Sequence, residues 1–265
     1  MTVAVLAGIL GLLIGSFLNV CIYRLPRDLS VVRPRSRCPE CERPIAWYDN
    51  VPVVSYVLLG AKCRHCGWGI PWRYPLVELA TGALFFAAVR LHGPEPVAWK
   101  LCLLAALLVE LSVSDLETRI LPDEFTLGGT VLGVALAFWV PMPVGLVSVM
   151  AAGVVGQAAA SAAEAAAGAA FTGGALWFVG WLYQKVRRRD GLGFGDVKLV
   201  ALIGAFLGLK GTLLALILGS VAGSVIGVAY IWLAKKQAAS YELPYGTFLG
   251  AGALAVAFGG PYFLP

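Results

Sequence analysis

Charged residues are scarce in this sequence of 265 residues. Asp, Glu, Lys and Arg together make up 13% of the chain, whereas 59% of it is hydrophobic. Soluble proteins carry about 25% charged and about 45–50% apolar residues. The scarcity of charge therefore excludes a disordered chain, a coiled coil and a soluble α/β enzyme. The net charge of +5 comes with no nucleic-acid-binding motif, so we expect a lipid bilayer and no nucleic acid as partner.

Uninterrupted apolar runs predict the membrane spans, because about 20 apolar residues cross a hydrocarbon core. The candidate runs are 3–22, 75–91, 97–113, 125–141, 166–184, 199–209, 211–233 and 243–263. We therefore predict an all-α polytopic membrane protein with about eight transmembrane helices. The first run is preceded by no Lys or Arg and followed by no small-residue cleavage site, so we interpret it as a span and not as a signal peptide.

The positions of the basic residues predict the orientation, because cytoplasmic loops retain Lys and Arg. If the chain starts outside, 17 of the 20 basic residues fall on the cytoplasmic side and only Arg90, Lys100 and Lys210 on the other. We therefore expect an extracytoplasmic N-terminus. An Ala-rich stretch at 144–170 would reverse this pattern if it added a crossing. We expect it to lie at the interface or to lengthen the fifth helix.

Four of the six cysteines lie in the only long extramembrane segment, residues 24–73. They form two C-x-x-C pairs separated by 21 residues, Cys38 with Cys41 and Cys63 with Cys66. This spacing is typical of a tetrahedral zinc site with four cysteine ligands. Two disulfides are the alternative, but thiols stay reduced in the cytoplasm. We predict a structural zinc ion, because a unit this small needs a bound metal or another cross-link to fold. His65 is the alternative ligand to one of the cysteines.

Acidic residues in or beside membrane helices are costly and mark function. The acidic residues in such positions are Glu78, Glu110, Asp115, Asp123 and Asp196. Asp115 is expected at the cytoplasmic C-terminus of the third helix, where the helix dipole disfavours a carboxylate. Asp196 follows Gly193 and Gly195 at the start of the sixth helix, where a helix N-cap is the structural alternative. The two glycines leave room for a substrate backbone to approach. For Asp123 we favour the N-cap role.

The predicted topology places Asp115 and Asp196 at the same depth on the same face of the membrane. Two carboxylates in a low-dielectric site share one proton. The charged member then takes a proton from water, and the protonated member hydrogen-bonds the scissile carbonyl. We predict an amide hydrolase without a covalent intermediate. An ion-coupled transporter with a zinc-stabilised docking module is the alternative, and it would need carboxylates deeper in the spans. A purely structural scaffold leaves Asp115 unexplained.

The chain resembles the type IV prepilin peptidases nearly from end to end. The motifs that carry the resemblance are GSFLNVCIYRLP at 15–26, the four-cysteine unit with WYDNVP at 47–52, YPLVE at 74–78, Asp115 with LPD at 121–123, GFGDVK at 193–198 and LPYGTFL at 243–249. G-x-G-D alone is weakly specific. In this order, and together with the cysteine pairs, the combination is specific.

The resemblance implies a G-x-G-D intramembrane aspartyl protease, the class that includes presenilin. Such an enzyme lies in the bacterial inner membrane and cleaves the basic leader of type IV prepilins and type II secretion pseudopilins after Gly, at the cytoplasmic face. It then N-methylates the new terminus with S-adenosylmethionine. The family aspartates map onto Asp115 and Asp196, and the zinc ligands onto the four cysteines. No Gly-rich nucleotide loop marks the methyl-donor site. The implied parts are a first helix at 1–23, a cytoplasmic zinc unit at 24–73 and a peptidase bundle at 74–265.

A cytoplasmic acidic group is expected to receive the basic leader. Its members are Asp115, Glu117, Asp123, Glu124, Asp190 and Asp196. A cleft of one charge sign concentrates a ligand of the opposite sign. The apolar helix that adjoins the leader in the substrate is expected to lie against the bundle.

Overall fold

The computed structural model describes residues 1–141, 145–151, 156–188, 193–233 and 243–259. All regular elements in these ranges are helices, which confirms the predicted all-α class. Five of them are long and apolar enough to cross a membrane. Four residues that the predictions above include lie outside the described ranges. They are Asp190 of the acidic group and three of the counted basic residues, Arg189, Lys235 and Lys236. The chain divides into two compact units, Met1–Glu110 and Leu111–Pro265.

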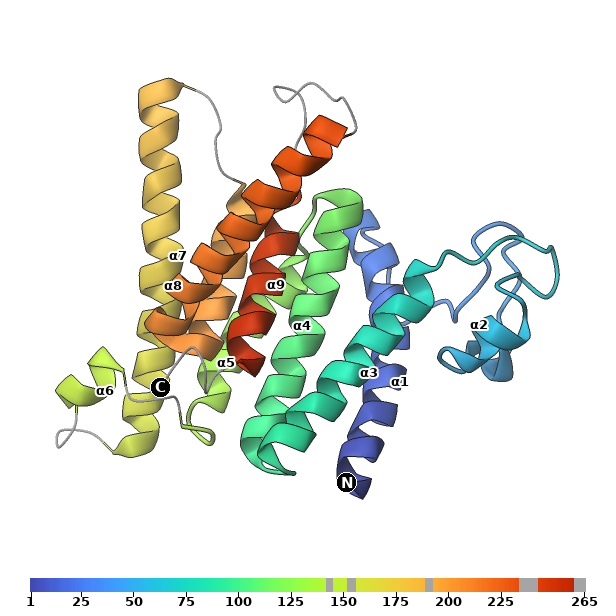
Figure 1. Ribbon diagram of the computed structural model, residues 1–265, viewed down its shortest axis with the longest axis horizontal. Helices are drawn as coiled ribbons and strands as arrows, with labels where there is room; N and C mark the ends of the chain where they lie inside the picture. The colour runs from blue at the N-terminus through green and yellow to red at the C-terminus, as the bar shows by residue number, and fades with distance from the viewer. Residues whose placement is uncertain (142–144, 152–155, 189–192, 234–242, 260–265) are drawn as a thin grey trace. The chain divides into compact units, whose positions relative to one another are not determined.

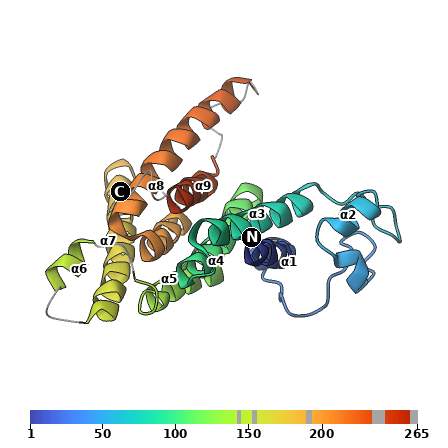
Figure 2. The same cartoon turned by 60° about the horizontal axis from the view of Figure 1, so that its bottom comes forward.

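The N-terminal unit contains the helix pair α1 (Thr2–Arg24) and α3 (Arg73–His92), which lie side by side (Figures 1 and 2). Small residues explain their close approach. A methyl group on Gly15 would lie 2.7 Å from Glu78 Cα, and one on Gly11 would lie 2.8 Å from Gly82 Cα. Backbones that approach this closely gain van der Waals contact, which drives helix association in lipid. Gly11 and Gly15 therefore serve the packing of α1 against α3.

The segment between α1 and α3 carries the cysteine pairs and little regular structure. Its helices are two 3-10 turns, Leu25–Arg27 and Trp47–Asn50, and the short α2 (Val54–Leu58). Two isolated β-bridges, Arg37 with Pro44 and Lys62 with Gly69, close a turn around each cysteine pair. A segment with so few packed elements depends on local hydrogen bonds and on the cysteine cluster described below.

The C-terminal unit begins within α4 (Pro96–Thr118) and continues through five further helices: α5 (Asp123–Leu136), α6 (Leu146–Ala151), α7 (Gln157–Arg187), α8 (Phe194–Leu233) and α9 (Tyr245–Phe258). Helix α8 packs against α5, α7 and α9 (Figure 1). Close contacts between glycines again make this possible, because a methyl group on Gly168 would lie 2.6 Å from the Gly204 carbonyl oxygen. Helix α8 is therefore the central element that positions the start of α9.

Each of the eight predicted apolar runs overlaps a helix along its described residues, although α5 ends at Leu136, before the end of the run 125–141. The sixth and seventh runs are joined in α8, which is interrupted at Gly208 by a non-helical backbone with φ 68°. Residues 157–170 of the Ala-rich stretch lengthen the fifth predicted helix, because α7 already begins at Gln157. The remainder of the stretch forms the separate α6 or lies outside the described residues. Glu164 is buried within α7, and its Oε2 accepts a hydrogen bond from the Val147 N–H at 2.8 Å. This carboxylate holds the start of α6 and explains a charged residue in an Ala-rich helix.

Candidate active site and metal centre

Asp115 lies in the last turn of α4 and is buried, with 6% of its surface exposed. Its Oδ2 accepts two hydrogen bonds from Thr247, one from the backbone N–H at 2.8 Å and one from the hydroxyl at 3.1 Å. Thr247 is the third residue of α9, so the free N–H groups at the positive end of that helix face the carboxylate. The N-terminus of α9 thereby offsets the unfavourable position of Asp115 at the end of α4.

Asp196 lies in the first turn of α8 and is half-buried. It is the third residue of the helix, and its backbone N–H donates to the Gly193 carbonyl at 3.1 Å. The helix therefore starts before Asp196, and its carboxylate is not the N-cap that was the structural alternative. This carboxylate lies beside Gly193, where a methyl group would lie 3.4 Å from Asp196 Oδ2.

Leu121 packs close to Gly195 of α8 and to Gly246 of α9. A methyl group on Gly246 would lie 3.2 Å from the Asp115 carboxylate and 3.3 Å from Leu121 Cδ1, and one on Gly195 would lie 3.2 Å from the same Cδ1. Asp115 and Asp196 are close enough to interact electrostatically. The two predicted site residues therefore lie in one region of the C-terminal unit, at the end of α4 and the start of α8. Leu121 occupies the space beside Gly195 that the sequence suggested for a substrate.

Asp123 is not the N-cap of α5, contrary to the prediction. Pro122 holds the N-cap position and Asp123 is the first helical residue. The Pro122 carbonyl accepts hydrogen bonds from the backbone of Phe125 and Thr126, whereas the Asp123 carboxylate pairs with Lys198. Pro122 takes the N-cap position with an extended backbone, so Asp123 is the first residue inside the helix. The ion pair connects the start of α5 to the first turn of α8.

The rest of the predicted acidic group is exposed where it is described. Glu117 and Glu124 are both on the surface of the C-terminal unit, on α4 and α5. Thr247 is the functional residue that the sequence did not single out by itself. Its only signal was its place in the LPYGTFL motif after Pro244, because its partner Asp115 is 132 residues away.

The four cysteines Cys38, Cys41, Cys63 and Cys66 form one cluster that can hold a metal ion. Their sulfur atoms all lie within 4.8 Å of one another, and those of Cys38 and Cys66 are 3.8 Å apart. Tetrahedral zinc with Zn–S bonds of about 2.3 Å requires sulfur atoms about 3.8 Å apart. All four cysteines have free thiols. The donor set therefore fits zinc, and it leaves no position for a reactive water.

The two cysteine pairs have the same local structure. The N–H of Cys38 donates to the Arg43 carbonyl at 3.0 Å, and that of Cys63 donates to the Trp68 carbonyl at 2.8 Å. The residue after each pair has a left-handed backbone: Gly67 adopts it without strain and Glu42 at φ 56°. The Nδ1 atom of His65, the alternative ligand, is 3.5 Å from the Arg43 guanidinium and lies outside the cysteine cluster.

Backbone amides prepare the second pair for a metal. The N–H groups of Cys66 and His65 donate to the Cys63 sulfur and lower the pKa of this thiol to about 7. A thiolate is the form that binds metal. Nearby, Arg64 donates to both oxygens of Asp49, at 2.8 and 2.6 Å, and lowers the pKa of that carboxyl. This ion pair fixes the 47–50 turn to the second cysteine pair.

Comparison with known proteins decides the family. Residues 9–91 match the bacterial Peptidase A24 N-terminal domain and residues 102–228 match the type IV leader peptidase family. The chain is 35% identical to a prepilin leader peptidase/N-methyltransferase of Burkholderia pseudomallei, over 97% of this chain and 85% of the relative. The chain belongs to the type IV leader peptidase family. The family resemblance noted in the sequence is thereby confirmed.

Two further relatives carry the same name. The Myxococcus xanthus protein is 44% identical over 85% of this chain, which spans 62% of that relative's length. The Klebsiella pneumoniae protein is 38% identical over 79% of this chain and 87% of the relative. No solved structure matches this type IV leader peptidase. The comparisons do not support the transporter alternative.

Proposed function

We propose that this chain is a membrane aspartyl peptidase that removes the basic leader of type IV prepilins and type II secretion pseudopilins after Gly. The observation that carries the proposal is the pair of electrostatically interacting carboxylates, Asp115 from the end of α4 and Asp196 from the start of α8. Two such groups near one another supply a general base and a general acid.

In this mechanism the charged aspartate takes a proton from a water molecule, and the water oxygen attacks the scissile carbonyl carbon. The protonated aspartate donates to the carbonyl oxygen as the C=O bond opens. The tetrahedral intermediate then collapses: the leaving nitrogen takes the proton that the first aspartate accepted from water, the C–N bond breaks, and the second aspartate recovers its proton from the hydroxyl of the intermediate. Thr247 holds Asp115 through Oδ2 alone, so the other oxygen of this carboxylate remains for water or substrate.

The relatives' name supports a second reaction, methylation of the new N-terminus with S-adenosylmethionine as the donor. When bound, the donor would supply a methyl group to the neutral amine, which would release a proton as the sulfonium becomes a neutral thioether. We further propose that Cys38, Cys41, Cys63 and Cys66 hold structural zinc. The distribution of basic residues supports a topology in which the two aspartates and the four cysteines face the cytoplasm and the N-terminus lies outside.

A direct assay tests both reactions. The purified protein in lipid nanodiscs is incubated with a synthetic substrate that has a basic leader ending in Gly and an apolar helix after it. We expect mass spectrometry to detect loss of the leader, followed by the addition of one methyl group only when S-adenosylmethionine is present. Cleavage at another residue, or no cleavage, contradicts the peptidase proposal.

The exposed carboxylates of Glu117 and Glu124 are expected to attract the basic leader. Reversing both to Lys should raise KM for this substrate several-fold, because like charges then meet at the site. The matched control is Glu95→Lys, an exposed residue just before α4, for which KM should stay unchanged. For a substrate with a neutral leader, KM should be the same in the wild type, the double variant and Glu95→Lys. An unchanged KM for the basic leader in the double variant contradicts the role.

A further inference from the structure

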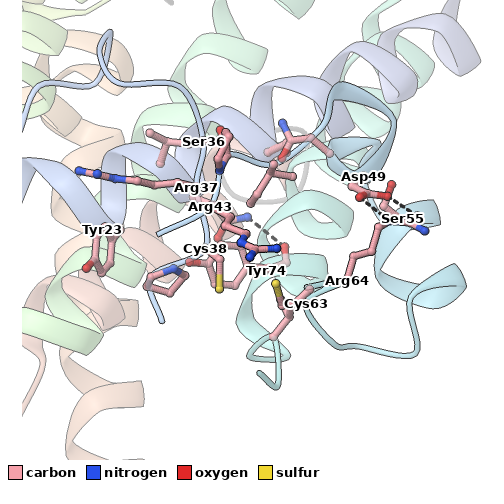
Figure 3. Close-up of a pocket in the computed structure, with 18 of the residues that line it drawn as sticks. Tyr23, Ser36, Arg37, Cys38, Arg43, Asp49, Ser55, Cys63, Arg64 and Tyr74 are labelled. Atoms are coloured by element: carbon pink, nitrogen blue, oxygen red, sulfur yellow. Dashed lines mark hydrogen bonds and ion pairs between the residues drawn. The ribbon is translucent and has the colours of Figure 1, made fainter. Parts of the chain in front are cut away.

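A cavity of about 330 Å³ lies in the N-terminal unit, lined by residues between 16 and 78 (Figure 3). Its walls come from α1, from α3 and from the segment with the cysteine pairs. The size is that of a site for a small molecule. The peptidase mechanism uses none of its lining residues. Two of the sequence motifs that the mechanism leaves unexplained, at 15–26 and 74–78, contribute to it.

Asn19 provides an unsatisfied acceptor in this cavity. Only 2% of its surface is exposed. Its Nδ2 donates to the backbone oxygens of Gly15 at 3.3 Å and Tyr74 at 3.0 Å, whereas Oδ1 receives no hydrogen bond from any described residue. A buried acceptor without a donor is rare in native proteins and calls for a partner. A ligand with a hydrogen-bond donor would satisfy it.

Glu78 places a negative charge in the same cavity. Only 7% of this residue is exposed, and its Oε2 accepts a hydrogen bond from the Val53 N–H at 2.7 Å. The Ser16 hydroxyl also donates to this carboxylate. A buried carboxylate in a membrane protein is costly unless a cation is nearby. Together with Asn19, this group selects a ligand that carries positive charge and donors.

The walls add flat rings and an exposed cation. Tyr23, Tyr56, Trp68 and Tyr74 line the cavity, and rings of this kind stack on a heteroaromatic base. Tyr23 lies at one end, with Arg37 extending toward it, and the Asp49–Arg64 pair lies at the other end (Figure 3). The Arg37 side chain is exposed and can pair with a ligand carboxylate.

We propose that this cavity binds S-adenosylmethionine, with the sulfonium facing Glu78, an ammonium hydrogen on Asn19 Oδ1 and the adenine between the aromatic walls. The inference rests on the proposed methyltransferase function and assigns its site. The ligand has the required features: fixed positive charge, donors, a flat base and a carboxylate. It has no phosphate, so it needs no glycine-rich loop of the kind that binds phosphate.

Calorimetric titration of the full zinc-loaded chain in nanodiscs tests the role of Glu78. S-adenosylmethionine and S-adenosylhomocysteine differ in the charge on sulfur, so the wild type should bind the former more tightly. In Glu78→Gln, which keeps a hydrogen-bond acceptor for Val53, affinity for S-adenosylmethionine should fall at least about tenfold and the preference should disappear. Glu40→Gln removes the same charge from an exposed position outside the cavity and should behave as wild type. A preserved preference in Glu78→Gln overturns the assignment.

A mapping experiment on the wild-type chain keeps the proposal testable if Glu78→Gln does not fold. Ultraviolet irradiation with radiolabelled S-adenosylmethionine should place the label on peptides that contain Tyr23, Tyr56 or Tyr74. Label on peptides from 111–265 overturns the site but leaves the methyltransferase function standing. If the chain cleaves its substrate yet neither binds the donor nor methylates the product, the methyltransferase proposal fails together with the site.

Discussion

Replacing either Asp115 or Asp196 by asparagine should abolish leader cleavage while the protein remains folded in the membrane. Asparagine has nearly the same shape but neither takes nor gives the required proton. General acid or base catalysis contributes about 10²- to 10⁴-fold, so kcat should fall by roughly that factor in each variant. The measurement is the rate of leader release at saturating substrate, with zinc content and thermal unfolding as checks on the fold.

Asp28→Asn is the matched control for this experiment. Asp28 is exposed in the N-terminal unit and has a left-handed backbone with φ 55°, which asparagine also tolerates. Its kcat should equal that of the wild type. Cleavage that persists near the wild-type rate in either Asp115→Asn or Asp196→Asn ends the assignment of the carboxylate pair. Binding of the methyl donor should be retained in both, because its proposed cavity lies in residues 16–78.

Cys41→Ser should remove the metal and unfold the segment around the two cysteine pairs. Structural zinc contributes about 10–16 kcal/mol in zinc-finger peptides, and a segment held by two β-bridges and short turns has little else to stabilise it. We expect less than one equivalent of zinc by elemental analysis. Trypsin should cut faster at the exposed Arg35 and Arg37, while fragments of the C-terminal unit stay resistant.

The control for the metal prediction is Cys102→Ser. Cys102 is buried in α4, and its sulfur lies outside the four-cysteine cluster, 4.0 Å from the Phe85 carbonyl oxygen. This variant should keep one equivalent of zinc and the wild-type tryptic pattern. Stoichiometric zinc in Cys41→Ser would show that the four-cysteine ligand set is wrong.

Local patterns in the sequence predicted the features that depend on neighbouring residues. The apolar runs predicted the helices, and the cysteine spacing predicted a cluster whose sulfur atoms do lie within 4.8 Å of one another. The turn around each cysteine pair closes through hydrogen bonds that span four to five residues, such as the one from the Cys63 N–H to the Trp68 carbonyl. Spacing alone is enough to identify such a structure.

Features that depend on tertiary packing were missed or wrongly assigned. The Thr247–Asp115 contact joins residues 132 positions apart, and no periodicity in the chain indicates it. Leu121 occupies the space beside Gly195 because the α4–α5 connection passes there, which the G-x-G-D motif does not show. Asp123 was assigned as a cap from its place after Pro122, but its carboxylate pairs with Lys198 on another helix.

The hydrogen bonds from Thr247 to Asp115 also have a consequence for biosynthesis. Asp115 and Asp196 are both translated and inserted well before α9, which begins at Tyr245. Until that helix has been made and has docked, the Asp115 carboxylate lacks both of its donors from Thr247. A nascent chain therefore cannot complete this arrangement until α9, the last described helix, has been synthesised and has docked.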